Sequence, residues 1–409
     1  MSPPSEARAA RIASWAVFGV FAVSGFVFAS WVSRLPAIRD ELGLTPGQIG
    51  LVLLVGSAGS MVALPLTGAV VERIGTQRTT RMAALLSTAG FVAAALAVGV
   101  GSTPLVAAFL FVALMGISAW DVAMNLQGTV VEHDLGRAIM PRFHAGFSLG
   151  AVAGAATGAL AAAAGVPATW HIIGAVLLAC AAVLALTRRY LPDGAMTTSD
   201  EDGNEAEGER RSPLAAWAEP RTLMIGLMVL AAALTEGSAN DWLALSVVDG
   251  FSTSDAVGAL AFGLFVASMT AMRFAGTRLL DRFGRVPVLR LCAGLALIGL
   301  VVFALAPSLP LAVIAIVLWG LGAALGFPVG MSAAADDPAR SAARVSVVST
   351  IGYVAFLAGP PVLGLLADHV GYRMALLTIA APLVLSLILS SVAAPLPAAQ
   401  GGAAPGQRA

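Results

Sequence analysis

The sequence predicts an all-α integral membrane protein with twelve transmembrane helices in two pseudo-symmetric bundles of six. Three observations predict this fold: an apolar composition, twelve apolar runs of membrane-spanning length, and motifs that recur in the two halves. The 409 residues are 58% hydrophobic and 11% charged, with a mean hydropathy of +0.88. Because soluble domains carry roughly 25% charged residues, much of this surface must face lipid.

The spans are predicted from apolar runs of roughly 20 residues, the length that a hydrocarbon core about 30 Å thick requires. The first run follows Arg8 and Arg11 and lacks a small-residue cleavage site, so we expect a retained span rather than a signal peptide. The runs lie at residues 12–33, 47–71, 80–101, 104–128, 143–165, 168–189, 221–247, 255–277, 287–306, 309–331, 345–367 and 373–394.

An acidic stretch separates the spans into two groups of six. Residues 191–219 are rich in Asp and Glu and contain few apolar side chains. Such a segment cannot bury enough surface to fold, so we predict a flexible cytoplasmic linker. Residues 1–190 are expected to form the N-terminal six-helix bundle, and residues 220–409 the C-terminal one.

The distribution of arginine predicts the orientation. With the N-terminus inside, most arginines fall in cytoplasmic segments, whereas the opposite side holds only Arg34, Arg39 and Arg373. Basic residues are enriched in cytoplasmic loops, so both termini are predicted to lie in the cytoplasm.

The loops after spans 2 and 8 carry related motifs. Glu72 and Asp281, which occupy the same position in each, are 209 residues apart. Repeated bundles with a site at their interface are an architecture of secondary transporters, in which one half rocks against the other. The motifs read Gly68-Ala-Val-Val-Glu72-Arg73-Ile-Gly75 and Thr277-Arg-Leu-Leu-Asp281-Arg282-Phe-Gly284, and a related pattern appears at Gly364, Asp368 and Gly371.

These loops resemble the G-x-x-x-[DE]-R-x-G signature of the major facilitator superfamily. The first copy matches fully, and in the second Thr277 replaces the leading glycine. The segments 30–40, 235–242 and 344–353 look like a poorly characterised group of bacterial inner-membrane facilitators, distantly related to the fucose–proton symporter. The resemblance covers essentially the whole chain and implies the major facilitator fold and secondary active transport.

The loop charges also have a physical interpretation. Glu72 beside Arg73, and Asp281 beside Arg282, place opposite charges at helix ends near the cytoplasmic surface. Such charges favour one closed arrangement of the bundles, so we predict a gating latch rather than a binding site. The predicted gating residues are Gly68, Glu72, Arg73, Gly75, Asp281, Arg282 and Gly284.

Inserting an ionisable residue into a membrane span costs at least ~2.5–3.5 kcal/mol on insertion scales, so each such residue requires a structural or functional explanation. Arg273 in span 8 and His144 at the start of span 5 are expected to be interfacial. Asp121 in span 4 and Glu236 in span 7 are predicted to couple protons or bind substrate. Loss of water favours the neutral form of a carboxyl group, which lets it exchange protons when water reaches it from one side.

Asn125 and Asn240 are predicted to be hydrogen-bonding neighbours of these acids. The resemblance aligns Asp121 and Asn125 with an acid and an asparagine of fucose-type symporters. It places Val32 where those symporters carry an acid, which argues against sugar specificity. Structural hydrogen bonding is the alternative role for the acids.

Three tryptophans, Trp31, Trp120 and Trp319, are candidates for stacking on a sugar or heterocyclic ring, with helix packing or interfacial anchoring as the alternative. The leading functional interpretation is proton-coupled uptake of a small polar solute. A drug or metabolite efflux antiporter of the same fold is an alternative, although span 5 lacks the proline of a pattern that antiporters often carry. A further alternative is a membrane sensor that does not transport a solute.

Other classes are disfavoured. The net charge of zero gives no reason to expect nucleic-acid binding, and a chain without lysine has no P-loop. The two cysteines, Cys180 and Cys292, are too far apart to predict a metal site or disulfide framework. No catalytic constellation suggests an enzyme. We expect a monomeric, multi-pass inner-membrane protein that contacts lipid, solute and protons and has no cofactor or metal.

Overall fold

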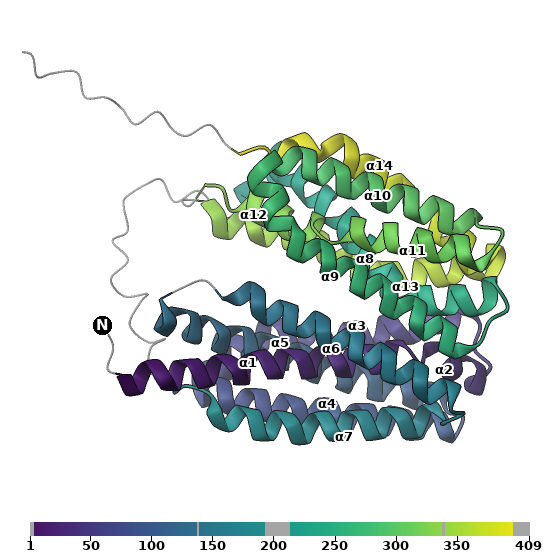
Figure 1. Ribbon diagram of the computed structural model, residues 1–409, viewed down its shortest axis with the longest axis horizontal. Helices are drawn as coiled ribbons and strands as arrows, with labels where there is room; N and C mark the ends of the chain where they lie inside the picture. Colours follow the sequence, from purple (N-terminus) through teal and green to yellow (C-terminus); the bar gives the residue numbers. More distant parts are fainter. Residues whose placement is uncertain (1–3, 137–138, 193–212, 338–339, 396–409) are drawn as a thin grey trace, which may run out of the picture.

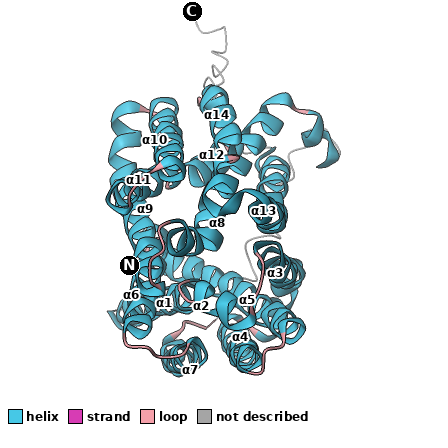
Figure 2. Ribbon diagram, turned by 90° about the vertical axis from the view of Figure 1, so that its right-hand side faces the viewer, coloured by secondary structure: helices cyan, strands magenta, loops and turns pink. Residues whose placement is uncertain are grey.

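The computed structural model describes residues 4–136, 139–192, 213–337 and 340–395, and the regular elements in these ranges are helices (Figures 1 and 2). Most of the predicted linker, residues 193–212, lies outside them. Its last part is helical, because Pro213–Ala218 forms the short 3-10 helix η2, which packs against the C-terminal bundle.

The helices form two bundles that lie side by side (Figure 1). The N-terminal bundle consists of α1 (Pro4–Val32), α2 (Leu35–Leu42), α3 (Pro46–Ile74), α4 (Thr76–Gly99), α5 (Thr103–Leu135), α6 (Met140–Ala163), α7 (Ala168–Leu186) and η1 (Thr187–Arg189). The C-terminal bundle consists of α8 (Pro220–Gly250), α9 (Asp255–Phe283), α10 (Arg285–Leu305), α11 (Leu309–Ala323), α12 (Gly326–Ala334), α13 (Ser341–Leu377), α14 (Ala380–Leu389) and η4 (Ser390–Ala393).

Within the described ranges, eleven helical segments are long and apolar enough to cross a membrane. The last, Ala343–Ala393, has 51 residues. At 1.5 Å per residue it is roughly 75 Å long, more than twice the hydrocarbon core. Gly371 interrupts it with a φ of 76°, a conformation that favours glycine. This segment therefore contains two predicted spans, 345–367 and 373–394.

The same backbone conformation connects helices at all three copies of the loop motif. Gly75 joins α3 to α4 with φ 82° and ψ 162°, and Gly284 joins α9 to α10 with φ 77° and ψ 171°. Gly371 has φ 76° and ψ 161°. The last glycine of the motif thus makes the same turn at each connection.

Residues 34–46, which the predicted spans leave unassigned, form α2 and the start of α3. Helix α2 ends at Gly43, whose φ of 62° is the left-handed conformation of a helix C-cap. Helix α3 then begins with a capping box, in which Thr45 accepts from Gln48 N–H and the Gln48 side chain accepts from Thr45 N–H.

Large apolar side chains remain exposed on the outer surface, as expected where lipid replaces water. Trp170, Leu178 and Ile388 are each more than 60% exposed. Inside each bundle, glycine permits close packing. A Cβ at Gly150 of α6 would collide with the backbone oxygen of Ala22 in α1.

The two ends of the molecule differ in how the bundles meet. We call the end with the Gly75 and Gly284 turns the linker end, and the opposite one, which holds α2, the α2 end. At the α2 end, Arg39 Nη1 lies 2.6 Å from Asp249 Oδ1 of the other bundle, and Gly47 N donates to Asp368 Oδ1 over 3.0 Å. Toward the linker end the bundles diverge (Figure 1).

Candidate functional site

A polar stripe runs along the middle of α5. Asp121, Asn125 and Thr129 follow one another at intervals of four residues and therefore share a helix face. Asn125 Nδ2 donates to the Asp121 backbone oxygen (2.9 Å), and Thr129 Oγ1 donates to that of Asn125 (3.0 Å). Asp121 and Thr129 are exposed, whereas Met124 is fully buried.

This stripe faces the other bundle. Asp121 interacts electrostatically with the hydroxyl of Tyr353, which belongs to α13 of the C-terminal bundle. Asp121 is therefore an exposed carboxyl group halfway along a spanning helix, within electrostatic range of a helix of the opposite bundle.

In the C-terminal bundle, Glu236 of α8 pairs with Arg273 of α9. Arg273 Nη2 lies 3.2 Å from Oε1 and 3.1 Å from Oε2 of Glu236. The side chains of Arg273 and Glu236 are 33% and 22% exposed, so water reaches the pair. Arg273 was expected to be simply interfacial. Sequence reasoning missed this pairing, because spacing along the chain does not show which helices are neighbours.

His144 is a further residue that the sequence left at the interface. It lies near the start of α6, is exposed, and interacts electrostatically with Arg273 of the opposite bundle. Its ring meets Phe21 edge-on, with centroids 5.3 Å apart. Four ionisable side chains, two from each bundle, therefore border the region between the bundles.

Residues after Glu236 continue the polar face of α8. Asn240 follows by four residues, shares the face of Glu236 and is half-buried; its hydrogen bonding to that acid stays a prediction. Asp241 is also half-buried, whereas Trp242 is buried with its ring centroid 5.6 Å from that of Tyr372.

The two tryptophans of the predicted site are buried in the N-terminal bundle. Trp31 is 5% exposed, with its ring centroid 5.5 Å from that of Phe91. Trp120 is 1% exposed and belongs to the core. Successive helix residues point about 100° apart, so a neighbour of Asp121 can be buried while Asp121 is exposed. Both rings therefore have the alternative role, which is packing within the helix bundle.

The predicted gating loops are apart in this structure. Glu72, Arg73, Asp281 and Arg282 are exposed, and among the residues that the structure describes none of the four forms an ion pair. A Cβ at Gly68 would have no neighbour within 4 Å. The latch is therefore not engaged in this arrangement.

The third motif copy makes the kind of contact that was predicted for the other two. Asp368 accepts the hydrogen bond of Gly47 N in the first turn of α3, where the helix dipole favours an acid. This contact joins the two bundles at the α2 end, which is opposite to the two gating loops.

Comparisons with known proteins agree on a single family. The sequence profile of the Major Facilitator Superfamily matches residues 16–245 and 225–409. The chain is 32% identical over 356 residues to the uncharacterized transporter y4wD of Sinorhizobium fredii, covering 87% of this chain and 91% of that protein. It is 28% identical over 362 residues to membrane protein MosC of Rhizobium meliloti, covering 88% and 85%.

Solved transporters share the fold at low sequence identity. The nucleoside transporter NupG superposes with a TM-score of 0.72 at 16% identity, covering 93% of this chain and 98% of that one. The transporter FucP in its outward conformation gives 0.64 at 15% identity, covering 95% and 100%.

Proposed function

The chain belongs to the major facilitator superfamily, and from this premise we propose that it takes up a small polar solute across the inner membrane, coupled to protons. One observation carries the proposal. Ionisable side chains from both bundles lie within electrostatic range of the opposite bundle, and the two bundles meet at the α2 end and diverge at the linker end. A monomer without cofactor suffices for such a mechanism.

We assign the linker end to the cytoplasm. The arginines outside the spans support this assignment, because exposed ones such as Arg78, Arg278 and Arg282 gather at that end. Two of the three arginines at the α2 end have protein partners. Arg39 forms an ion pair with Asp249, and Arg373 donates to backbone oxygens. With this orientation, the structure is an inward-open state.

The acids have different roles in the proposed cycle. Asp121 has no basic partner on its own bundle among the described residues, so a proton is its simplest countercharge. Glu236 is neutralised by Arg273 instead. Protonation of Glu236 would remove that attraction and release guanidinium donors toward the solute. Asn125 and Asn240 supply hydrogen bonds of either polarity to a polar solute.

A flux measurement tests the proposal. A thermal-shift screen of sugars, nucleosides, amino acids and drugs first identifies a solute, and proteoliposomes then report its accumulation under an imposed pH gradient. We expect Asp121→Asn and Glu236→Gln to abolish gradient-driven accumulation, whereas Glu41→Gln, an exposed acid of α2, leaves it intact. Retained accumulation in both variants across pH would rule out proton coupling. Counterflow in everted vesicles distinguishes efflux from uptake. Thermal stabilisation of the protein by a solute that is not transported would indicate a sensor.

A further inference from the structure

A cavity of about 590 Å³ lies at the α2 end of the C-terminal bundle. Its walls are the last residues of α8 and α10 and the turn of α13 at Gly371, and Pro46 of α3 adds one residue of the N-terminal bundle. Asp249, which lines the cavity, is 13 residues from Glu236, about 20 Å along α8. The cavity is therefore separate from the proposed transport site.

Two side chains of opposite charge border this cavity. The Asp249 side chain is 43% exposed, and its Oδ1 pairs with Arg39, whereas no described residue forms an ion pair with its Oδ2. Arg373 Nη1 donates to the backbone oxygen of Gly250, the residue next to Asp249, over 3.2 Å. Asp249 and Arg373 are thus close together, but they are not among the ion pairs that the described residues form.

Arg373 is held in place yet keeps free donors. Its Nη2 donates to the backbone oxygens of Phe303 and Ala306, and its guanidinium carbon lies 4.3 Å from the ring centroid of Phe251. With the bond to Gly250, these contacts use three of its five N–H groups. Its Nε has no hydrogen-bond partner among the described residues. A positioned guanidinium group that the protein does not pair with an acid is suited to a carboxylate.

Much of the remaining wall is aliphatic. Leu305, Val370 and Met374 line the cavity and are 60%, 48% and 38% exposed. Leu305 is the last residue of α10, and the other two flank the Gly371 turn, so this apolar surface lies at helix ends. Aliphatic surface beside a carboxylate and a guanidinium group favours a ligand with an aliphatic part and two opposite charges.

We propose that this cavity binds an α-amino acid with an aliphatic side chain. The ammonium group pairs with Asp249 Oδ2, and the carboxylate accepts hydrogen bonds from Arg373. The aliphatic side chain packs against Leu305, Val370 and Met374. The volume of the cavity lies within the range of small-molecule sites. An amine or a carboxylate alone would leave one of the two protein charges without a partner.

Binding is linked to closure of the α2 end. Pro46 completes the cavity because α3 packs tightly on α13, where a Cβ at Gly364 would lie 2.6 Å from the Pro46 backbone oxygen. Arg39 uses Oδ1 of Asp249, so an ammonium group at Oδ2 adds to this contact between the bundles. A ligand shifts an equilibrium toward the state with which it makes more contacts. The bound amino acid therefore stabilises the state that is closed at the α2 end.

Isothermal titration calorimetry on the purified protein in detergent tests the ligand class. The probes are L-leucine, 3-methylbutylamine and 4-methylpentanoate, of which the last two each lack one of the charges, and glycine, which lacks the aliphatic part. We expect leucine to bind, and each of the other three to bind about tenfold more weakly. Absence of leucine binding, or equal binding of the amine or the carboxylate, would overturn the proposal.

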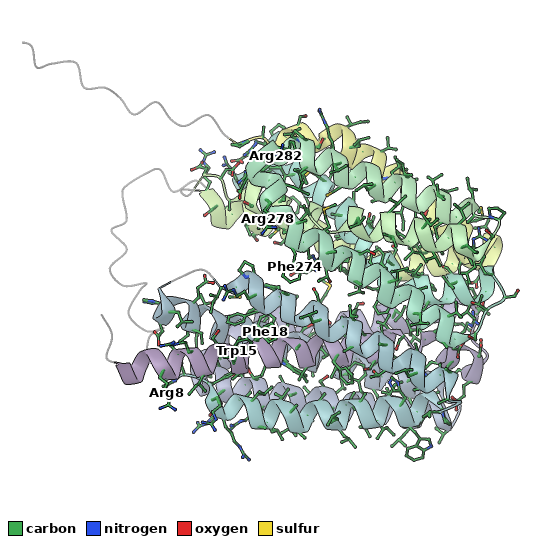
Figure 3. All side chains as sticks on the ribbon, viewed as in Figure 1. Arg8, Trp15, Phe18, Phe274, Arg278 and Arg282 are labelled. Atoms are coloured by element: carbon green, nitrogen blue, oxygen red, sulfur yellow. The ribbon has the colours of Figure 1, made fainter. Side chains whose placement is uncertain are left out.

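Two pairs of variants locate the site. Val370→Trp fills the cavity without changing a charge and should abolish leucine binding, whereas Val362→Trp, about 12 Å away on α13, should leave it unchanged. Arg373→Gln should weaken binding about tenfold. Its control is Arg278→Gln, which removes an exposed arginine at the linker end of α9, labelled in Figure 3. If Arg373→Gln does not fold, the valine pair still decides the question.

Asp121→Asn distinguishes this cavity from the transport site. Leucine binding that persists in Asp121→Asn and is lost in Val370→Trp supports the cavity. The reverse pattern would show that leucine occupies the transport site and would overturn the proposal. Gly364→Val, which must displace Pro46, should also weaken leucine binding, and an unchanged affinity would contradict the link to closure. None of these measurements needs flux, so failure of the transport proposal would leave them untouched.

Discussion

Arg273 Nη2 contacts both carboxylate oxygens of Glu236, at 3.1 and 3.2 Å, across the boundary between α9 and α8. One nitrogen thus neutralises an acid that would otherwise stand alone within the membrane. The Nε donates only weakly, to the Ala324 backbone oxygen over 3.4 Å. Much of the donor capacity of the guanidinium group is therefore left for water or solute.

The pair should show strong coupling in a double-mutant cycle. Arg273→Gln leaves Glu236 without its countercharge and should destabilise the protein by about 1–3 kcal/mol, below the range for fully buried pairs because both side chains are partly exposed. Adding Glu236→Gln should restore part of that loss, measured by unfolding in detergent. Simple addition of the two single losses would show that the pair does not act as a unit.

Close packing at the α2 end predicts that a larger residue at Gly50 favours the opposite state. A Cβ there would lie 2.6 Å from the Pro360 backbone oxygen of α13, so Gly50→Val must separate α3 from α13. A cysteine introduced at the buried Ala367 should then react faster with an impermeant maleimide. Gly174→Val, in α7 and without a neighbour within 4 Å of the added Cβ, should not change this rate. An unchanged rate for Gly50→Val would contradict the packing argument.

The features of the fold that depend on local sequence pattern could be predicted from the sequence. Hydrophobic run lengths place the membrane helices, and four-residue spacing correctly puts Asn125 on the face of Asp121. The turns at Gly75 and Gly284 follow from the loop motif, since glycine tolerates their positive φ.

What the sequence misses depends on which helices become neighbours. Arg273 looked interfacial because Glu236 is 37 residues away along the chain. Trp120 adjoins Asp121 in sequence, yet its ring faces the core. Asp368 had no predicted partner, because the start of α3 that it contacts is 321 residues away.

Glu219 should make stability depend on pH below neutrality. It precedes α8, outside the spans, and its oxygens lie 2.6 Å from Arg344 Nε and 3.0 Å from Arg340 Nη1. The hydrogen bond from Arg344, the largest cause, lowers the pKa of this carboxyl group. Its contribution is therefore complete above the ordinary glutamate pKa of about 4.3 and is lost as the pH falls through the lower folded value.

Comparison with Glu219→Gln tests the sign of this effect. The variant should unfold at a lower temperature than the wild type at pH 7, and the difference should shrink between about pH 4.5 and pH 3. Glu41→Gln, which replaces an exposed acid at the other end, should show no such convergence. A difference that stays constant or grows in acid would contradict the assignment.

Asp368 should stabilise the closed α2 end through both its acceptor oxygen and its charge. Asp368→Ala removes the acceptor of Gly47 N–H and the acid at the start of α3, and should cost about 0.5–2 kcal/mol, as loss of a helix cap does. Asp368→Asn keeps an acceptor but loses the charge that favours a helix N-terminus, so it should fall between alanine and the wild type. Unfolding midpoints in detergent give the order, and maleimide labelling at Ala367→Cys shows whether the end opens. If the alanine variant matched the wild type in both measurements, the contact would be incidental to closure, and the packing of Gly50 on Pro360 and the ion pair of Arg39 with Asp249 would hold that end.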